Sequence, residues 1–451
     1  MPSRPSSNGL RPAHAAVLGS GMAGLATAAA LAPLCERVTL FERDAPPEER
    51  GPRQGVPQGR HGHILLKDGE NALAETFPGL VAELEERGSC QVSFGSELRW
   101  FHHGVWKVPY DTGPVVHMQS RPLLESILRG RVAALGNVAF RYRTAVQGLE
   151  IEQGRATAVR VREEEGDRAE QTLPADLIVD ATGRGSNLVR RLAAHGYPAP
   201  PEDRLTIDLQ YSSRLVRPAP GAERTWKALL LYQTPPARRR VGLVFPIEDG
   251  RWVVTLGGYL GEHPPATEEG FLDFARSLEQ PDLFVALRDA EPLSEIQTLR
   301  FPAARWTHFE RLRRFPAGLL PVGDTVCSFD PVFGQGMSVA ARGARLLAAH
   351  VARDPRAENP RPYLRALARI VAAPWLLTSS EDLRYEQVEG RRPLWLPWLQ
   401  RYTHRIFRLT GKSAPDYDRL LRVLHLMAPP PLLFHPATLA RTVRFMAKVN
   451  D

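Results

Sequence analysis

The stretch that decides the fold lies near the start of the chain and runs Ala15-Ala16-Val17-Leu18-Gly19-Ser20-Gly21-Met22-Ala23-Gly24. A short apolar strand is expected to end at Gly19, where glycine permits a tight turn. Gly21 lets the backbone approach a pyrophosphate, and Gly24 lets the next helix pack against the strand. Residues 25–34 are mostly strong helix formers. The pattern predicts a strand, a phosphate-binding turn and a helix whose N-terminus points at the phosphates.

A second strand, residues 38–41, follows this helix and ends at Glu42. An acid about 20 residues beyond the glycine motif accepts a hydrogen bond from a ribose hydroxyl. Because a carboxylate repels a 2′-phosphate, Glu42 favours an unphosphorylated adenosine ribose. The segment therefore predicts a dinucleotide site, with these contacts: Gly19, Gly21, Met22, Ala23, Gly24, Glu42 and Arg43.

Two later segments select FAD among the dinucleotides. Residues 176–180 form a buried strand candidate that breaks into the polar loop Ala181-Thr182-Gly183. Residues 319–322 form another, which delivers Gly323-Asp324 to a loop where an acid can bind ribitol hydroxyls. The run Gly334-Gln335-Gly336-Met337 then opens a long helix, whose amides can face the pyrimidine end of a reduced isoalloxazine. Further predicted FAD contacts are Asp180, Ala181, Thr182, Gly183, Gly323, Asp324, Gly334, Gln335, Gly336 and Met337.

With these segments in place, the chain resembles the class A, single-component flavin monooxygenases with an aromatic-hydroxylase fold, over nearly all of residues 13–445. Within that class, residues 53–63 (RQGVPQGRHGH), 120–125 (SRPLLE) and 244–252 (VFPIEDGRW) are similar to the flavin epoxidases of polyether biosynthesis. The resemblance implies that Arg121 contacts FAD and that the loop from Arg60 to His63 lies beside the flavin ring. It also implies NAD(P)H as reductant, O2 as co-substrate and a flavin C4a-hydroperoxide as the oxygen donor.

The expected fold class is α/β: a Rossmann-like FAD-binding domain of the glutathione-reductase type, interleaved with an antiparallel-sheet substrate domain and followed by a C-terminal helical region. Interleaving is expected because the cofactor segments are dispersed along the chain. The predicted parts are a disordered N-terminus (1–12), the first FAD-binding part (13–200, with a substrate-sheet insertion near 90–118), the substrate sheet (201–305), the second FAD-binding part (306–352) and a helical cap (353–451).

The substrate sheet is predicted from strands at 205–216, 225–233, 241–247, 251–258 and 293–301, with a helix at 268–279. A lipophilic small molecule is the expected substrate. Predicted substrate contacts are Tyr211, Trp226, Leu230, Tyr232, Phe245 and Phe333. The Trp-, Arg- and Leu-rich tail has three open interpretations: a lid over the substrate, a peripheral membrane contact, or a cap packed on the first domain.

Few protein acids or bases are needed, since the cofactor carries the chemistry. An alkene needs no deprotonation, whereas a phenol does, and His61, His63 and Asp330 are the candidate catalytic residues. The favoured function is epoxidation of an alkene in a lipophilic polyketide or terpenoid, in secondary metabolism such as antibiotic biosynthesis. Alternatives are an aromatic hydroxylase, a flavin halogenase, a prenyl reductase and a non-catalytic FAD- or lipid-binding protein. The active-site lysine and Trp-rich motif in which halogenases resemble one another cannot be placed in this sequence.

Composition limits the other classes. The chain has 451 residues and a formal charge of +8, with basic residues spread along it and interrupted by acids, so no nucleic-acid partner is expected. Three cysteines without metal-ligand spacing predict free thiols, a reducing cytoplasm and no metal site. The N-terminus lacks the apolar core of a signal peptide, and no apolar run is long enough to predict a transmembrane segment.

Overall fold

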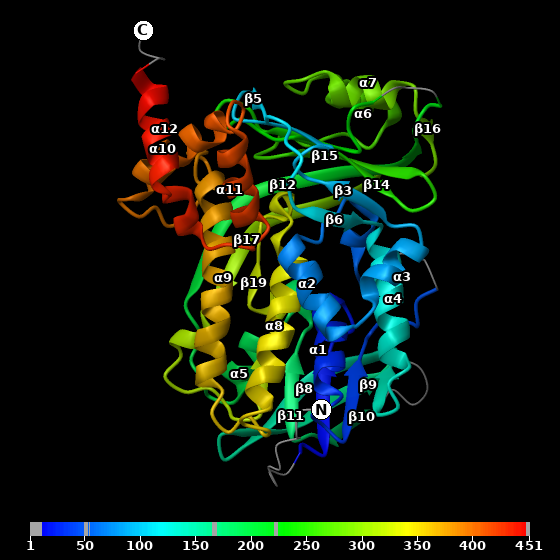
Figure 1. Cartoon of the computed structure of the whole chain (residues 1–451). Coiled ribbons are helices and arrows are strands. Elements are labelled where there is room, and N and C mark those ends of the chain that lie inside the picture. The colour runs from blue at the N-terminus through cyan, green and yellow to red at the C-terminus, as the bar shows by residue number, and fades with distance from the viewer. Residues whose placement is uncertain (1–10, 49–52, 54, 165–168, 221–223, 448–451) are drawn as a thin grey trace, which may run out of the picture.

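A parallel five-stranded sheet forms the lower half of the molecule in the computed structural model (Figure 1). The structure describes residues 11–48, 53, 55–164, 169–220 and 224–447, so most of the predicted disordered segment 1–12 lies outside the described residues. The strand order is β18 (Leu319–Pro321), β11 (Leu177–Asp180), β1 (His14–Leu18), β2 (Arg37–Phe41) and β7 (Val138–Arg141), with every neighbouring pair parallel. The three central strands are apolar runs buried on both faces, as expected for parallel strands.

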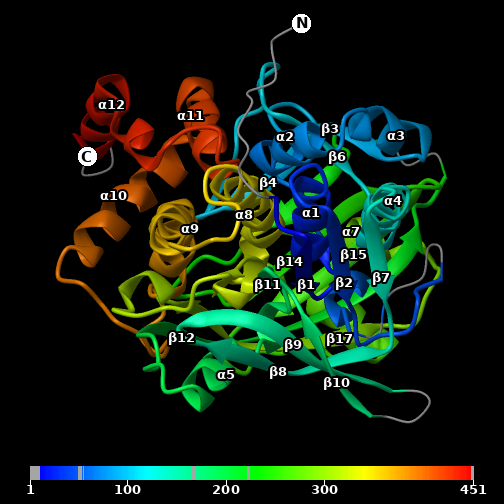
Figure 2. The ribbon, with the colours of Figure 1, turned by 90° about the horizontal axis from the view of Figure 1, so that it is seen from below.

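Helices cover one face of this sheet and a small antiparallel meander covers the other (Figure 2). The helical face carries α1 (Met22–Leu31), α2 (Lys67–Thr76), α4 (Arg121–Ala133) and α8 (Gln335–Val351), with α3 (Leu80–Glu86) beside them. The meander consists of β8 (Thr144–Glu152), β9 (Arg155–Glu163) and β10 (Glu170–Pro174), and the short helix α5 (Leu188–Ala194) lies near it. A parallel sheet covered by helices on one face confirms the predicted α/β class.

A nine-stranded, mainly antiparallel sheet forms the upper half. Its strands are β4 (Leu98–His102), β5 (Val105–Trp106), β12 (Glu202–Arg217), β13 (Ala228–Leu231), β14 (Arg240–Ile247), β15 (Arg251–Gly258), β16 (Glu291–Pro292), β17 (Gln297–Thr307) and β19 (Cys327–Ser328). The segment near 90–118 reaches this sheet through β4, which runs parallel to β13. The remaining pair, β3 (Cys90–Ser93) and β6 (Val115–Met118), forms a separate ribbon.

Successive side chains along each strand of the large sheet belong to two different hydrophobic clusters, one on each face of the sheet. Leu229, Leu231 and Val254 pack under α6 (Glu268–Arg276) and α7 (Asp282–Arg288). Leu230 and Phe245 belong to a cluster on the opposite face. Since successive side chains point to opposite sides of a strand, this period of two places the second set toward the interior of the molecule.

Four C-terminal helices complete the fold: α9 (Arg361–Asp382), α10 (Leu396–Leu409), α11 (Ala414–Leu424) and α12 (Pro436–Ala447). Helix α9 packs along α8 of the first domain, whereas α10 and α11 bury side chains such as Ile406 and Leu420 against the large sheet. The cap therefore contacts both halves of the molecule (Figure 1). In the part of the chain that the structure describes, no helix combines the length and the apolar character needed to cross a membrane.

Short 3-10 turns join these elements at Pro57–Arg60, Gly183–Gly185, Phe309–Arg311, Gly323–Thr325, Pro331–Phe333 and Pro430–Phe434. Three of them, at residues 57–60, 183–185 and 323–325, follow strands or precede helices at the upper edge of the parallel sheet. They shape the site described next.

Candidate functional site

A cavity of about 720 Å³ lies where the parallel strands end. Strand β1 delivers Gly19 to it, β2 delivers Glu42 and β11 delivers Ala181. The chain after β18 adds Asp324. Ligands of open α/β sheets bind at the carboxyl ends of the strands, and the volume lies within the roughly 300–1,000 Å³ typical of small-molecule sites.

Three glycines line or shape the first turn of this cavity, and they do so for different reasons. Gly19 has φ of +95°, which favours glycine, and a Cβ at Gly24 would lie 1.9 Å from the Gly19 carbonyl oxygen. A Cβ at Gly21 would meet no atom within 4 Å, because this backbone faces the cavity. Helix α1 begins at Met22 with no side-chain cap and no acid in its first turn. Its free amides and positive dipole end are therefore available to a phosphate.

Glu42 is held by a partner that the sequence did not reveal. Its Oε2 accepts hydrogen bonds from the Ser20 amide and hydroxyl at 3.0 and 2.8 Å and from Arg53 at 2.5 Å. Its Oε1 accepts the Asp44 amide at 3.1 Å, which leaves that oxygen capacity for a ribose hydroxyl. Burial alone would raise the pKa of Glu42, but Arg53 and these hydrogen bonds outweigh it and lower the pKa. The carboxylate is thus charged and fixed in position.

Asp324 lines the cavity. Burial raises the pKa of Asp324, and the guanidinium groups of Arg121, Arg184 and Arg305 oppose this effect. A Cβ at Gly336, in the first turn of α8, would lie 3.6 Å from Asp324 Oδ1. The uncapped N-terminus of α8 therefore lies beside an acid that can accept hydroxyl hydrogen bonds.

The loop from Pro57 to Ile64 forms the wall on the side of the large sheet, and hydrogen bonds fix its two histidines. His61 Nδ1 lies 2.7 Å from Ser213 Oγ, and the next residue's amide donates to Thr255 Oγ1 at 3.0 Å. His63 donates through Nε2 to the Gln58 carbonyl at 2.5 Å. Burial lowers the pKa of His61 to about 4, with Arg60 adding to the effect, and lowers that of His63 to about 3. Both imidazoles are neutral near pH 7.

Asp330, the third predicted catalytic residue, also lines the cavity but is not free. It accepts hydrogen bonds from the Tyr259 hydroxyl at 2.7 Å and from the Val332 amide at 2.9 Å. Asp382, from the end of α9, lies against it, and burial followed by the Asp330 charge raises the pKa of Asp382 well above its usual value. The two carboxyl groups therefore form a buried acid pair.

Most of the predicted FAD contacts line the cavity, and four do not. Those that line it are Gly19, Gly21, Met22, Ala23, Glu42, Arg43, Arg121, Ala181, Thr182, Gly183, Asp324, Gly334, Gln335, Gly336 and Met337. Gly24 acts through helix packing, as its expected role required, and Gly323 forms a turn with φ of +66°.

Arg60 and Asp180 do not line the cavity. The Arg60 side chain turns outward, where it donates to Gln297 at 3.2 Å. Asp180 is fully buried beneath the cavity and accepts hydrogen bonds from Thr182 and Thr325. Asp180 thus anchors the loop after β11.

The donor set fits FAD. Two helix N-termini without side-chain caps, a fixed carboxylate after β2 and Asp324 after β18 match the pyrophosphate, adenosine ribose, flavin ring and ribitol that the ligand would present. Five arginines that line the cavity, Arg43, Arg53, Arg121, Arg184 and Arg191, add positive charge for its phosphates.

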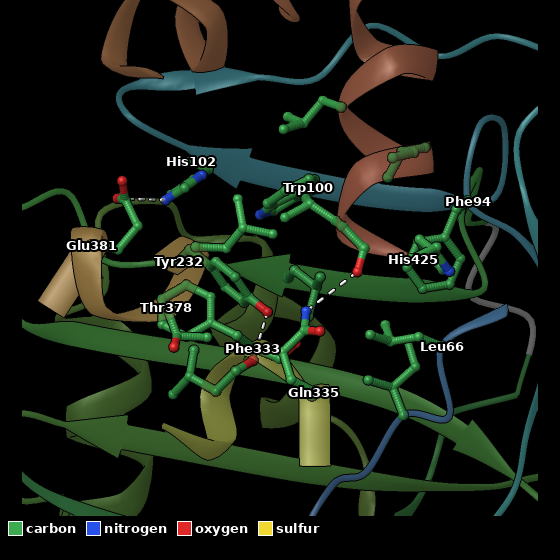
Figure 3. Close-up of a pocket in the computed structure, with 18 of the residues that line it drawn as sticks. Leu66, Phe94, Trp100, His102, Tyr232, Phe333, Gln335, Thr378, Glu381 and His425 are labelled. Carbon is green, nitrogen blue, oxygen red and sulfur yellow. Dashed lines mark hydrogen bonds and ion pairs between the residues drawn. The ribbon is translucent and has the colours of Figure 1, made fainter. Parts of the chain in front are cut away.

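A second, mostly apolar cavity of about 90 Å³ lies between the large sheet and the cap (Figure 3). We call it the substrate pocket. Leu230, Tyr232, Phe245 and Phe333 of the predicted substrate contacts line it. The sheet also contributes Trp100, and the cap contributes Leu377, Ile406, Phe407, Leu420, Leu421 and Leu424. The cap therefore closes the pocket, which agrees with the lid interpretation of the tail.

Two predicted substrate contacts lie elsewhere. Tyr211 lines the cofactor cavity, with its ring centroid 5.9 Å from that of His61. Trp226 lines neither cavity and stacks on Trp252, at 5.7 Å, in the cluster under α6 and α7. The sequence placed Trp226 inside a strand from residue 225, but β13 begins at Ala228, so alternation along the strand does not reach Trp226.

The two cavities share a wall. Gly62, His63, Ile64, Leu243, Pro331, Val332, Gly334 and Gln335 line both of them. If the flavin ring binds at residues 334–337, as the sequence predicts, it would adjoin the substrate pocket. A group bound in one cavity can contact a group bound in the other.

Sequence reasoning missed Arg53 and the residues on β4 and the cap that line the pocket. The alternation Leu98, Trp100, His102 along β4 was the available signal for one wall, because these residues share a face. The Trp-, Arg- and Leu-rich tail suggested a lid as one of three interpretations, but no local pattern identified which residues of α10 and α11 would line that face.

Fold and site together define a flavoprotein with an FAD cavity next to a closed apolar pocket. The chain belongs to the FAD binding domain family, whose model matches residues 13–360. It is 32% identical over 400 residues to Protein Rv3254 of Mycobacterium tuberculosis (strain ATCC 25618 / H37Rv), covering 85% of this chain and 83% of that protein.

Two solved structures share the fold over nearly the whole chain. The flavin-dependent brominase Bmp2 matches with a TM-score of 0.66 at 14% identity, covering 97% of this chain and 99% of that one. The p-nitrophenol 4-monooxygenase PnpA from Pseudomonas putida DLL-E4 matches with a TM-score of 0.64 at 16% identity, covering 91% and 98%. At these identities the likeness establishes the fold.

Proposed function

We propose that this protein is an FAD-dependent monooxygenase that uses NAD(P)H and O2 to transfer one oxygen atom to an apolar substrate. The observation that carries the proposal is the wall shared by the FAD cavity and the substrate pocket, because oxygen transfer requires the substrate beside the flavin. The p-nitrophenol 4-monooxygenase PnpA has the same fold, so the fold is compatible with this class.

The residues of the chain bind the cofactor and the substrate, orient them and exclude water from the site. FAD, when bound, would accept electrons from NAD(P)H and activate O2. The uncapped amides at the α8 N-terminus, which begins at Gln335, would be available to stabilise negative charge on a bound flavin ring. Cap residues such as Phe407 close the pocket, and exclusion of water protects a reactive oxygen donor.

Within this class, we propose epoxidation of an alkene as the first reaction to test. His61 and His63 are neutral and already hydrogen-bonded, and Asp330 is tied to Tyr259 and Asp382. None of the three stands ready as a base at the shared wall, and an alkene needs none. The resemblance to polyether epoxidases and a polyketide or terpenoid substrate remain part of this proposal.

Hydroxylation of an aromatic ring is the second candidate, favoured by the lining of the pocket. The walls include six aromatic side chains, namely Phe94, Trp100, Tyr232, Phe245, Phe333 and Phe407. The enclosed volume of about 90 Å³ is below the roughly 150 Å³ that accepts benzene in an engineered cavity. Both an aromatic ring and a larger alkene therefore require the lining side chains or the cap to move on binding. A compact aromatic ring requires a smaller movement than a polyketide or terpenoid alkene.

A halogenase is less well supported. In the described part of the chain, no lysine lines either cavity, and the buried Lys107 donates to the carbonyls of His102 and Phe407. The likeness to brominase Bmp2 shows the fold alone.

The test uses FAD-loaded protein, NADPH or NADH, and styrene or phenol as probes. We expect either nucleotide to bleach the flavin under nitrogen, and styrene to give styrene oxide after O2 is admitted. Formation of catechol from phenol without styrene oxide would establish the second candidate. Products that require bromide would establish a halogenase, and alkene reduction without O2 uptake a reductase. Failure of both nucleotides to bleach the flavin would contradict the proposal.

A pocket-filling variant gives the matched control. Leu230→Trp places a large ring inside the substrate pocket, away from the FAD-lining residues. We expect it to keep flavin bleaching and lose product formation.

A further inference from the structure

His102 stands out among the residues that line the substrate pocket. Its side chain is buried, with 2% of its surface exposed, and neither ring nitrogen has a hydrogen-bond partner among the described residues. Native proteins rarely leave a buried polar group unpaired. The ring nitrogens of His102 are therefore available to a group from outside the chain.

The surrounding rings hold this imidazole in one orientation (Figure 3). It stacks on Trp100 with 5.4 Å between ring centroids and 11° between planes. The rings of Tyr232 and Phe407 meet it edge-on, at 5.4 and 4.6 Å. The polar edge of His102 is thus fixed within an apolar pocket.

Glu381, at the end of α9, lies opposite His102. The distance from His102 Nε2 to Glu381 Oε2 is 3.9 Å, too long for a hydrogen bond. Glu381 itself is anchored, since His103 Nε2 lies 2.9 Å from Oε2 and Arg384 donates to Oε1 at 2.8 Å. One oxygen atom can make hydrogen bonds of about 2.8 Å to both His102 and Glu381, because two such bonds span the gap.

The charges of the pair decide which group fits. Burial, reinforced by His103 and Lys107, lowers the pKa of His102 well below its usual value, so the imidazole is neutral. Burial opposes ionisation of Glu381, but Arg384 and His103 outweigh it and lower its pKa to about 2. A neutral imidazole offers an N–H donor and a carboxylate accepts. The matching group both accepts and donates, as a hydroxyl does and a carbonyl does not.

A metal ion is a poorer match. His102, His103 and Glu381 do bring one ligand atom each within 4.8 Å of one another. His103 Nε2 is already engaged by Glu381, however, and the Arg384 guanidinium donates to Glu381 Oε1 at 2.8 Å. The positive charge of Arg384 opposes a cation.

We propose that His102 and Glu381 form a subsite for a hydroxyl group of the apolar substrate, an alcohol or a phenol. This inference rests on the proposed function, which assigns the pocket to the substrate. The hydroxyl oxygen accepts a hydrogen bond from the His102 imidazole, and its hydrogen is donated to the Glu381 carboxylate. With a pKa of about 2, Glu381 is too weak a base to ionise a phenol of pKa roughly 10, so the subsite binds the hydroxyl without deprotonating it.

Calorimetric titration of the FAD-loaded protein tests the subsite without requiring turnover. Two probe pairs differ only by a hydroxyl in place of a methyl group: phenol with toluene, and cyclohexanol with methylcyclohexane. We expect the wild-type protein to bind at least one hydroxyl probe tenfold or more tightly than its methyl partner. Preference in the phenol pair alone identifies a phenolic substrate, and preference in the cyclohexanol pair identifies an alcohol.

Variants of the two subsite residues test whether His102 and Glu381 cause the preference for the hydroxyl probe. His102→Phe keeps the ring stack and removes both nitrogens, and we expect it to reduce the preference to less than twofold while toluene affinity stays unchanged. Ser380→Ala is the matched control, because Ser380 lines the same pocket but donates to the Leu377 carbonyl. If His102→Phe does not retain FAD, Glu381→Gln provides the same test, since it keeps the shape and removes the charge.

Three results would overturn the inference: equal affinity within both pairs, a preference that survives in His102→Phe and Glu381→Gln, or stoichiometric Zn2+ binding that is lost in His102→Phe. Failure of the proposed function is distinguishable, because loss of oxygen transfer with an intact hydroxyl preference would leave the subsite standing.

Discussion

Two glycines of the first turn have different physical roles. Gly24 is a packing position, since a side chain there would collide with the Gly19 carbonyl. Gly21 is a ligand position, because its φ of −76° and ψ of −171° suit any residue and a side chain there would enter the cavity. Substitution of Gly21 therefore tests cofactor binding, whereas substitution of Gly24 disturbs folding.

Gly21→Val is therefore expected to fold normally and to lose FAD. The valine side chain meets no protein atom within 4 Å of its Cβ, but it occupies the space where the backbone approaches the pyrophosphate. The ratio of flavin to protein absorbance after purification measures the loss, and circular dichroism measures the fold. Gly130→Ala, at an open position in α4, is the control and should keep both. A yellow Gly21→Val protein with full occupancy would refute the FAD assignment of this turn.

Asp324→Ala is expected to weaken FAD binding by about 10- to 100-fold. The expectation follows from the loss of one charged hydrogen bond, which contributes roughly 1.5–3 kcal/mol. Fluorescence titration of the apoprotein with FAD gives the affinity. Unchanged affinity would mean that Asp324 serves only the loop.

At the scale of elements, the cap has an outer face as well as the inner one that closes the pocket. Leu394, Trp395 and Trp398 are 101%, 52% and 61% exposed at the start of α10. Residues 390–412 contain six Arg or Lys and no Asp or Glu. Exposed tryptophan beside basic residues is typical of segments that bind anionic membrane surfaces.

We propose that this segment contacts membranes peripherally. The protein is expected to sediment with phosphatidylserine vesicles, and salt should weaken the binding because the electrostatic part is screened. Replacing Leu394, Trp395 and Trp398 together with alanine should abolish the binding. Val285→Ala, an exposed apolar residue on α7, is the control. Binding that persists in the triple variant would exclude this segment.

Site residues that are marked by a sequence pattern of a few consecutive residues could be predicted from the sequence. Contacts between elements that are distant in the sequence could not. The glycine turn, Glu42, Asp324 and the start of α8 were identifiable because each follows from a strand end and its next few residues. The anchoring role of Asp180 could not be predicted because it depends on Thr325, which is distant in sequence. His102 escaped notice because its importance depends on α9 and α10 closing over β4.

For the whole molecule, buried neutral histidines predict sensitivity to acid. The pKa of His61 is lowered by burial to about 4 from 6.5. In the unfolded chain this histidine takes up a proton below pH 6.5, and in the folded protein only near pH 4. Stability is therefore lost as the pH falls from 6.5 toward 4, by about 2 kcal/mol for this residue at pH 5.

The measurement is urea unfolding at pH 7 and pH 5. His61→Asn should reduce the loss of unfolding free energy between the two pH values by about 2 kcal/mol, because asparagine does not titrate. Tyr211→Phe alters a neighbouring residue without removing a group that titrates between pH 5 and pH 7, so it should leave the loss of unfolding free energy unchanged. An equal loss in the wild-type protein and in His61→Asn would show that protonation of His61 does not cause it.

Oxygen transfer from the FAD cavity to the substrate pocket across their shared wall is the central step of the proposed function. Turnover under 18O2 in ordinary water, with NADPH or NADH and with styrene and phenol as probes, tests it directly by mass spectrometry. We predict a product carrying one 18O atom from O2, formed by the wild-type protein and absent with Leu230→Trp. A product whose oxygen comes from water, or labelled product that Leu230→Trp still forms at the wild-type rate, would contradict the account.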